Sequence, residues 1–423
     1  MKNKIFFIIL LIPAFISCSE EWLTLKPENN DLANNFWVLE EDAVNASIAM
    51  YDAFDNPSFY ELSHIVFGDV WADDMMCPDP NWYIDIDGYT YAADNIASQG
   101  KVGNYSGAWF AYYSGVQRSN YLLDNIDKID KVELSNELRT QLKNEAYFVR
   151  AVSYFNIVNV YGDAPLFIHN KPISELYNVN TSPKSDIWNL ILEDLNSATN
   201  LPKKGITDMG RATRGAAYGF LARANLYLKN YQAAYDACEE IFKDTIGSGS
   251  NIYGLEADFG ANWDNLSKNG KESIFEIQFK AKDTRWFWGS NPGSWIAAWT
   301  GTSSFVASGK AFGIMLPQTH VDTIFEKNQL GQEIDLRREM TIFRPGDVYY
   351  LKDSNAVFSS GATTTNLLLA KYIRRNHYNI ETDGPYDSDM NMPIIRLAEI
   401  YLIHAEAAYE LNRTQEAFNS LNR

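Results

Sequence analysis

The chain contains few cysteines, few histidines and none of the common catalytic motifs. Three cysteines among 423 residues do not indicate a disulfide framework, and Cys77 and Cys238 are both expected to be unpaired. The five histidines are scattered, with no His-Glu-x-x-His, Gly-x-Ser-x-Gly or Gly-x-Gly-x-x-Gly pattern. His404 lies inside a predicted helix pair and is expected to be structural. The sequence therefore indicates no metal site, no cofactor and no enzyme activity.

Positive charge is also scarce. The 36 Lys and Arg residues are outnumbered by 54 Asp and Glu residues, which gives a formal net charge of -18. Such a surface repels phosphate backbones and anionic lipid headgroups, so nucleic acid is not an expected partner. A chain of this length can still bury a large core and divide into two or three lobes.

A long apolar run of the kind found in membrane-spanning helices is missing near the N-terminus. The apolar run at residues 5–12 ends at Pro13. It is far shorter than the ~20 residues that a spanning helix needs. Lys2 and Lys4 precede it, which is the charge pattern of a secretory signal.

A small residue, Ser17, stands directly before Cys18, as in signals of the lipoprotein kind. Cleavage there would remove residues 1–17 and free Cys18 to carry lipid, which would tether the mature protein to a membrane. The alternative is an ordinary secreted protein with a chance cysteine near the cut. Phe15 and Ile16 favour that alternative, because they depart from the usual Leu-then-small pattern.

Aromatic residues are abundant: the chain has 11 Trp, 25 Tyr and 23 Phe. Tyr and Trp combine an apolar face with a polar tip, so the surplus indicates a wet binding surface. The alternative interpretation is a helical core that is merely rich in aromatic rings.

Helical periodicity dominates the chain after residue 40. Apolar residues recur three and four apart at residues 40–54 and 109–126, and again from about Ser135 to a stop near Gly162. Ser182, followed by proline, predicts the start of a further helix, with the serine as its cap. Residues 56–108 lose this period and carry turn residues, so we expect a long loop there.

Two pairs of small residues predict two helix hairpins. Ala222 and Ala234 are twelve positions apart in the segment 212–243, and Ala405 and Ala417 repeat that spacing. Small residues let antiparallel helices approach closely, as in a tetratricopeptide repeat. Hairpins of this kind need neighbours to cover their apolar faces. Because residues 411–423 end without a capping element, we interpret the chain as C-terminally incomplete and expect this form to aggregate or be proteolysed.

Between the hairpins, residues 272–279 alternate in polarity and predict a short strand. A stretch rich in Gly and Ser follows. It contains four of the chain's tryptophans, Trp286, Trp288, Trp295 and Trp299.

The order of these segments resembles the SusD/RagB family of outer-membrane nutrient-binding lipoproteins. The resemblance covers nearly the whole mature chain. It is carried by residues 36–54, Trp71 to Asp74, 144–151 with Tyr154 and Phe155, 162–166, 216–231 and 393–402. It implies a mainly α SusD-like fold with tetratricopeptide-like hairpins, long aromatic loops and little β structure. It also implies two regions, 18–245 and 246–423.

The same resemblance implies a surface lipoprotein that caps a SusC-like TonB-dependent outer-membrane barrel and delivers glycans or peptides to it. Glu20 and Glu21 resemble the acidic signal that sends such lipoproteins to the cell surface. Family members continue well past the equivalent of Arg423, which agrees with an incomplete chain.

Tryptophans on loops are the best candidates for ligand binding. A sugar ring has an apolar C–H face that can lie flat on an indole, while Asp and Asn side chains bind its hydroxyls. Each well-buried ring would contribute ~1.5 to 3 kcal/mol, less the cost of ordering its loop. The candidates are Trp82, Tyr83, Trp286, Trp288 and Trp295, with Asn81, Asp73 and Arg285 as polar partners. The alternative for each ring is that it anchors its own loop.

Three other functions stay open on the sequence. A peptide ligand suits the same architecture and the same aromatic loops. Asp73-Asp74 and Asp85-Ile86-Asp87 are candidates for glycan hydrolysis, which needs two carboxyl groups roughly 5 to 10 Å apart. Asp85-x-Asp87-Gly88 resembles a calcium loop only faintly, because no glutamate stands at the required later position. A helical-repeat adaptor that binds only proteins is the last alternative, and the loop tryptophans argue against it.

Overall fold

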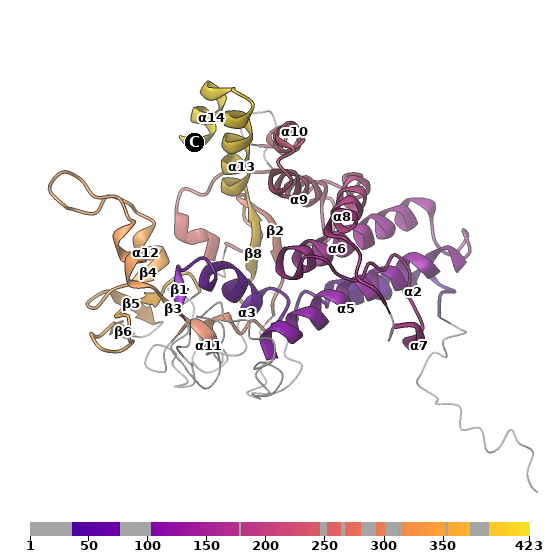
Figure 1. Ribbon diagram of the computed structural model, residues 1–423, viewed down its shortest axis with the longest axis horizontal. Coiled ribbons are helices and arrows are strands. Elements are labelled where there is room, and N and C mark those ends of the chain that lie inside the picture. Colours follow the sequence, from indigo (N-terminus) through magenta and orange to yellow (C-terminus); the bar gives the residue numbers. More distant parts are fainter. Residues whose placement is uncertain are drawn as a thin grey trace, which may run out of the picture.

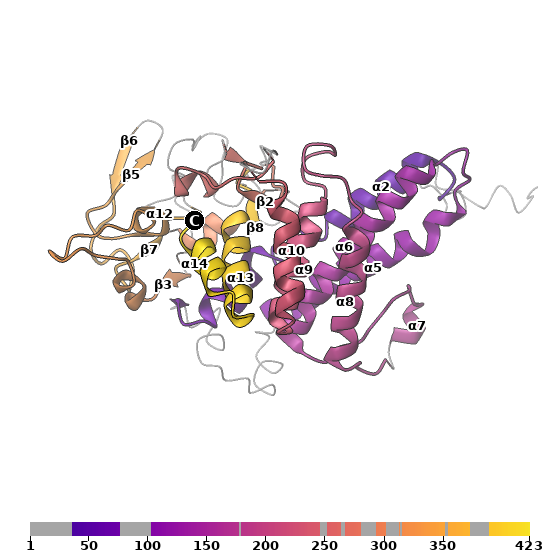
Figure 2. The ribbon, with the colours of Figure 1, turned by 90° about the horizontal axis from the view of Figure 1, so that it is seen from above.

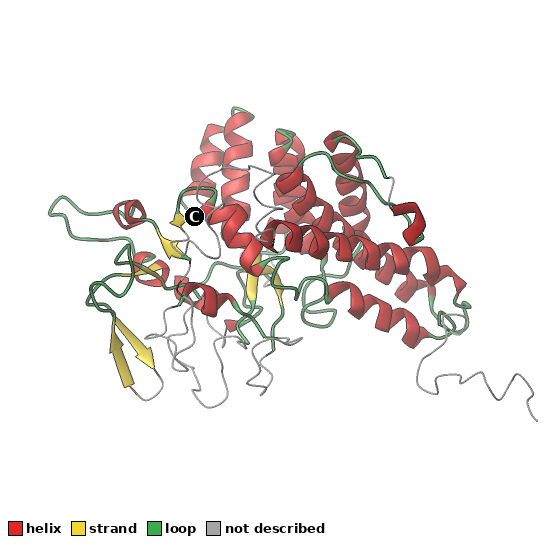
Figure 3. Ribbon diagram, turned by 60° about the horizontal axis from the view of Figure 1, so that its bottom comes forward, coloured by secondary structure: helices red, strands yellow, loops and turns green. Residues whose placement is uncertain are grey.

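A computed structural model describes residues 36–76, 103–176, 179–245, 252–263, 267–280, 293–301, 313, 315–351, 354–372 and 389–423. Helices dominate these residues and the strands are short, which confirms the predicted mainly α fold (Figures 1 and 3). None of the helices in this part of the chain is both long and apolar enough to cross a bilayer.

The helices form one continuous array. Seen from above, neighbouring helices follow one another in the order α14, α13, α10, α9, α8, α6, α5 and α2 (Figure 2), and each contacts the next. The N-terminal half of the array consists of α2 (Glu40–Tyr51), α5 (Gly103–Asn125), α6 (Asn136–Tyr161) and α8 (Lys184–Ala198). The hairpins predicted from the alanine spacing supply the rest.

Helix α6 lies at the centre of the N-terminal half and has the predicted limits. Ser135 caps it by accepting a hydrogen bond from the backbone N–H of Leu138 (3.2 Å). Gly162 ends it at a φ of 73°, a conformation that favours glycine. The predicted core positions Leu142, Val149 and Val152 are buried. The periodicity of the sequence therefore identified the packed face correctly.

Both helix hairpins close with the same turn. In α9 (Arg214–Tyr227) and α10 (Tyr231–Phe242) the turn residue Lys229 has a φ of 60°, and in α13 (Leu397–Glu410) and α14 (Thr414–Leu421) Asn412 has a φ of 61°. Each turn makes the hydrogen-bond pair of a Schellman motif, including Asn230 N–H to the Asn225 carbonyl and Arg413 N–H to the Ala408 carbonyl, both 2.8 Å.

The paired alanines are buried, as expected of small residues that let two antiparallel helices approach closely. Ala222 and Ala234 are fully buried, and Ala405 and Ala417 are less than a tenth exposed. The two hairpins also pack against each other through α10 and α13 (Figure 1). Each hairpin thus covers part of the other's apolar face.

A two-stranded antiparallel sheet joins the halves of the chain. Its strands are β2 (Ser273–Ile277), which confirms the strand predicted there, and β8 (Met392–Arg396). The alternating pattern predicted a short strand, and all of β2 is buried. Phe275 on this strand packs against Phe54, Phe148 and Phe220, with ring centroids 5.1 to 6.4 Å apart. The burial of the whole strand was not visible in the sequence pattern.

Two local predictions were wrong. Residues 61–70, expected as loop, form α3 (Glu61–His64) and the π-helix η3 (Ile65–Val70). Ser182 does not cap α8. Pro183 occupies the capping position, and the carboxylate of Asp163 instead accepts the hydrogen bond from Lys184 N–H (2.8 Å). The true cap is distant in sequence, so local pattern could not reveal it.

A smaller β-rich lobe lies at one end of the molecule, at the left of Figure 1. Antiparallel pairs join β1 (Met75–Met76) to β3 (Leu316–Pro317), β4 (Ile342–Phe343) to β7 (Leu368–Leu369), and β5 (Val348–Leu351) to β6 (Ser354–Val357). Short helices complete the described elements: η4 (Ile126–Lys128), α7 (Ile173–Leu176), η5 (Phe259–Trp263), α11 (Ile296–Thr300), η7 (Thr319–Thr323) and α12 (Arg338–Thr341).

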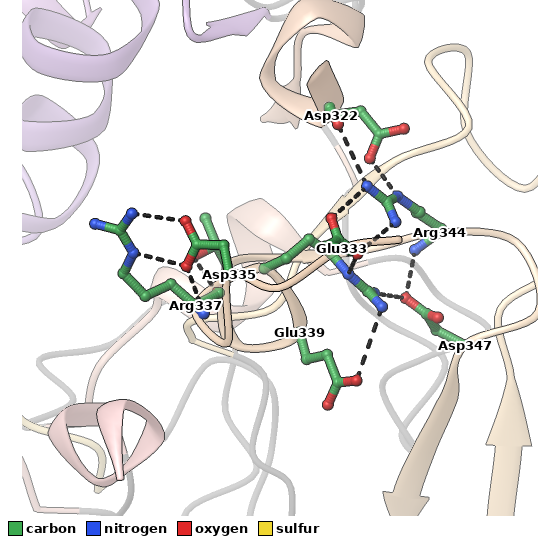
Figure 4. Close-up of polar contacts among 9 residues, drawn as sticks. Asp322, Glu333, Asp335, Arg337, Glu339, Arg344 and Asp347 are labelled. Atoms are coloured by element: carbon green, nitrogen blue, oxygen red, sulfur yellow. Dashed lines mark hydrogen bonds and ion pairs between the residues drawn. The ribbon is translucent and has the colours of Figure 1, made fainter. Parts of the chain in front are cut away.

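Ion pairs hold this lobe together, because its two apolar clusters are small. Arg344 binds Glu333 through both terminal nitrogens (2.8 and 2.9 Å) and also contacts Asp322, while Arg338 contacts Glu333 (3.1 Å) and Asp347 (Figure 4). Partial burial works to raise the pKa of Glu333, but the hydrogen bonds and charges of the two arginines outweigh it and lower that pKa.

Candidate functional site

Most of the predicted ligand-binding residues lie outside the described part of the chain. These are Asn81, Trp82, Tyr83, Arg285, Trp286 and Trp288. The predicted lipidation site Cys18, the Asp85-x-Asp87-Gly88 segment and Cys77 lie outside it too. Cys238 is described. It is unpaired, as predicted, and it is also buried. Asp73 and Trp295 are the two predicted ligand-binding residues that the structure places.

An aromatic pair stands beside Asp73. Phe67 belongs to the π-helix η3 and Trp71 directly follows it, and their ring centroids are 4.8 Å apart. Both side chains are partly exposed. π-Helical turns are rare and frequently occur at functional sites. The two rings together therefore form a partly exposed apolar surface.

Two carboxylates follow this aromatic pair. Asp73 is exposed and has a φ of 64°, a backbone conformation uncommon outside glycine. The carboxylate of Asp74 lies 3.4 Å from Nε2 of His320, and the Asp74 carbonyl accepts a hydrogen bond from Gln318 N–H (2.9 Å). The short β1–β3 pair thus brings residues 73–76 against residues 316–320.

Two cations lie over the ring of Trp263, and one of them, Lys371, interacts electrostatically with Asp69 of the π-helix η3. The Nζ of Lys371 lies 5.0 Å from the ring centroid of Trp263, and the guanidinium carbon of Arg396 lies 4.9 Å from it. Burial lowers the pKa of Lys371, while the negative charge of Asp69 opposes that shift. Burial also raises the pKa of Asp69. The charge of Lys371 therefore interacts with that of Asp69 on η3.

Trp295 lies in the core. Its side chain is 8% exposed and its ring is stacked near Trp299, with centroids 6.3 Å apart. The segment is held by the buried Glu61 on α3, whose Oε1 accepts hydrogen bonds from Ser294 and from the backbone N–H groups of Trp295 (2.7 Å) and Ile296 (3.2 Å). This burial favours the anchoring alternative for Trp295.

The chemistry of the exposed site is that of recognition. Partly exposed rings and acidic side chains can bind the C–H faces and the hydroxyls of a polar ligand. Within the described ranges, no group of three or more His, Cys, Asp or Glu side chains could hold a metal ion. His404, predicted to be structural, is 4% exposed and contacts the Ser420 hydroxyl (2.8 Å) between the two hairpin helices.

Sequence reasoning missed part of this site. Phe67 and Lys371 were not considered, and Trp71 was noted only for its resemblance to a family. The signal that could have found the pair is the spacing of Phe67 and Trp71, four apart, which is a helical repeat within a segment interpreted as loop. The partners of η3 come from distant segments, and no local pattern could have identified them.

Comparison with known proteins agrees with this architecture. A family model described as "Starch-binding associating with outer membrane" matches residues 21–228, and the model of the SusD family matches residues 271–423. A curated relative, SusD-like protein P25 of Formosa agariphila, is 27% identical over 464 residues. That alignment covers all of this chain and 81% of the relative.

Solved structures show the same fold. A SusD-like protein from Bacteroides fragilis superposes with a TM-score of 0.73 at 20% identity, covering 94% of this chain and 80% of that protein. A structure described as a laminarin-binding SusD-like protein superposes with a TM-score of 0.70 at 22% identity, covering 91% and 84%. Because both family models match in chain order and together span most of the sequence, this chain belongs to the SusD family.

Proposed function

We propose that this protein is a non-catalytic surface lipoprotein that binds glycans and delivers them to a SusC-like TonB-dependent outer-membrane transporter. The observation that carries the glycan proposal is the partly exposed Phe67–Trp71 pair beside Asp73. The chain continues from β1 directly into the segment with Asn81, Trp82 and Tyr83, which we propose as part of the same surface. A related structure described as laminarin-binding supports this ligand class.

The membrane anchor is proposed on the N-terminal sequence. Ser17 before Cys18 suits lipoprotein processing, and the family description places such proteins at the outer membrane. Growth with a lipid precursor that can be detected on the protein would test this. Label should appear on the wild type and disappear in Cys18→Ala. Labelling that persists in Cys18→Ala would contradict the assignment.

The ligand test is affinity electrophoresis of the unlipidated protein through gels that contain different polysaccharides, laminarin and starch among them. We expect one glycan to retard the wild type. Trp71→Ala, Asp73→Asn and the double variant Trp286→Ala/Trp288→Ala should each lose most of that retardation. Loss of one stacked ring at ~1.5 to 3 kcal/mol corresponds to about ten- to a hundredfold weaker binding.

Tyr409→Ala is the matched control, because Tyr409 is an exposed ring (66%) on helix α13. It should migrate like the wild type. If no glycan retards a folded sample, the proposal fails for glycans and the peptide alternative takes its place. If the purified protein releases reducing ends that vanish in Asp73→Asn, the non-catalytic part of the proposal is wrong.

A further inference from the structure

A cavity of about 380 Å³ opens between helix α2, the residues that follow it, the loop 208–211 and strand β2. None of the residues of the proposed glycan surface lines it. Phe54 and Phe275, both buried, are part of its apolar wall, with ring centroids 6.0 Å apart. Ile48 and Met209 also line it, and they are 55% and 81% exposed. The cavity is therefore an apolar pocket open to solvent.

The polar side chains in the inner wall of this cavity already have hydrogen-bond or ion-pair partners within the protein. Tyr51 donates to Glu145 (3.1 Å) and accepts from the N–H of Ala212 (3.0 Å). Arg211 is paired with the same buried Glu145 at 2.7 Å, so its charge is neutralised. Glu276 accepts hydrogen bonds from Asn391 (2.9 Å) and from a backbone N–H (3.0 Å). An anion would therefore find no free cation among these groups.

Asp55 is different. Its carboxylate lines the cavity, is half-buried, and has no hydrogen bond or ion pair among the described residues. The nearby acids have partners: Asp52 is 2.5 Å from Arg118, and the exposed Asp208 is 3.5 Å from Nε of Arg211. Burial and then the charge of Asp52 raise the pKa of Asp55 to about 7. The raised pKa agrees with the lack, among the described residues, of a cation that would stabilise the ionised carboxylate.

We propose that this cavity is a second ligand site, which binds an organic ammonium group with its nitrogen on the Asp55 carboxylate and its carbon body against Phe54, Phe275 and Met209. The apolar wall would exclude a fully hydrated metal ion, and the acids at the cavity would repel carboxylates and phosphates. The same chemistry could come from an amino sugar or from a lysine side chain. This inference does not depend on the proposed glycan surface.

The first experiment is calorimetric titration of the wild type with butylammonium and with butanol, which match in carbon body and differ in charge. Butylammonium should bind about tenfold or more tightly than butanol, because a charge-assisted contact adds to the same apolar burial. Binding should strengthen from about pH 5.5 to about pH 8, since the ligand stays protonated while Asp55 ionises. Equal binding of the two probes, or no binding of butylammonium, would overturn the proposal.

Asp55→Asn keeps the shape of the side chain and removes its charge. It should weaken butylammonium binding by about tenfold and abolish the pH dependence. Asp127→Asn is the matched control, because Asp127 is 64% exposed, ion-paired with Lys143 and not part of the cavity lining, and the affinity of this variant should stay within about twofold of the wild type. Circular dichroism should show both variants folded. Unchanged affinity in Asp55→Asn would contradict the assignment of the nitrogen.

Two further titrations identify the source of the ammonium group. Glucosamine is compared with N-acetylglucosamine, and Nα-acetyl-lysine amide with Nα-acetyl-norleucine amide, so the members of each pair differ in whether they carry the ammonium charge. Preference for the charged member in either pair supports the site and names its ligand class. The glycan gels provide an independent readout, because Asp55→Asn should leave retardation by a neutral glycan unchanged.

Discussion

At the residue scale, the buried carboxylates decide how stability depends on pH. Glu61 is completely buried, and one of its oxygens, Oε2, has no hydrogen-bond partner within the described residues. Burial raises its pKa to about 7, although the hydrogen bonds from Ser294 and two backbone N–H groups work to lower it. A protonated Glu61 is thus favoured in the folded state over a range where the unfolded chain is ionised.

Replacing Glu61 with glutamine should flatten the pH dependence of stability. Between ~4.3, the unfolded pKa, and about 7, the folded state binds more protons, so the free energy of unfolding falls as pH rises. Over that range, ionisable Glu61 lowers the free energy of unfolding of the wild type by on the order of 3 kcal/mol, and Glu61→Gln should lack this decrease. Urea denaturation at several pH values between about 5 and about 8 would measure it.

The effect of Glu61 is measured as the difference between the pH slopes of the free energy of unfolding in the wild type and in Glu61→Gln. Asp55 and Asp194 also have raised pKa values, about 7 and about 6, and contribute slopes of the same sign. The side-chain amide oxygen in Glu61→Gln would still accept the hydrogen bond from Ser294, so the variant should fold. Identical slopes in the two proteins would show that the pKa of Glu61 is not raised.

At the scale of elements, one buried ion pair joins α6 to α8. Arg150 donates to both oxygens of Asp194 at 2.8 Å, and both side chains are almost completely buried. Asp194→Ala would leave the guanidinium buried with only Asn120 and a backbone carbonyl as acceptors. We expect a loss of about 3 to 5 kcal/mol in the free energy of unfolding.

The double variant Arg150→Met/Asp194→Leu is the control for that loss. It removes both charges and should recover most of the stability, because no unpaired charge remains buried. Urea denaturation of the two variants beside the wild type measures the difference. A double variant as unstable as Asp194→Ala would show that lost packing, rather than the unpaired charge, causes the loss.

The turn of the α9–α10 hairpin provides a substitution that should increase stability. Lys229 adopts a left-handed conformation that costs an L-residue free energy and costs glycine little. Lys229→Gly should therefore stabilise the protein by roughly 0.5 to 1 kcal/mol. Lys243→Gly, at the right-handed end of α10, should not stabilise it. Thermal unfolding would rank the three proteins, and a lower melting temperature for Lys229→Gly would contradict the turn assignment.

At the scale of the whole molecule, the two predicted regions share one core. A single hydrophobic cluster runs from Trp37 to Ala407, and the Phe275 ring of β2 lies among Phe54, Phe148 and Phe220. Strand β8 and helix α13 then bring the last segment back against α9 and α10. The described parts of these two regions are therefore continuous in packing, although each has its own hairpin.

We therefore expect that a fragment of residues 36–245 does not fold on its own. Without β2, β8 and α13 it would expose Phe148, Phe220 and the outer face of α10 to water. Circular dichroism should show helix without a cooperative thermal transition, and a dye that binds apolar surfaces should bind strongly. A sharp transition in the fragment would instead establish an independent N-terminal domain.

Features that depend on residues close together in the sequence were predictable, and features that depend on contacts between distant segments were not. The limits of α6 and the paired alanines of the hairpins came from patterns within a few turns of helix. The loop interpretation of residues 61–70 failed because α3 and η3 interact with distant segments. Glu61 accepts hydrogen bonds from residues 294–296, and Asp69 interacts with the charge of Lys371, which no local period reveals. Of the predicted ligand residues, the structure places Asp73 on an exposed turn and Trp295 in the core.

By itself, the sequence determined the helical class, the two hairpins, the unpaired state of Cys238 and the membership of the SusD family. These depend on spacing and order along the chain, which a sequence displays directly. The tertiary structure alone decided that Glu61 holds a segment 234 positions away and that Asp55 lines a cavity without a cation partner among the described residues. Burial and charge pairing arise between distant segments, so only the folded chain defines them.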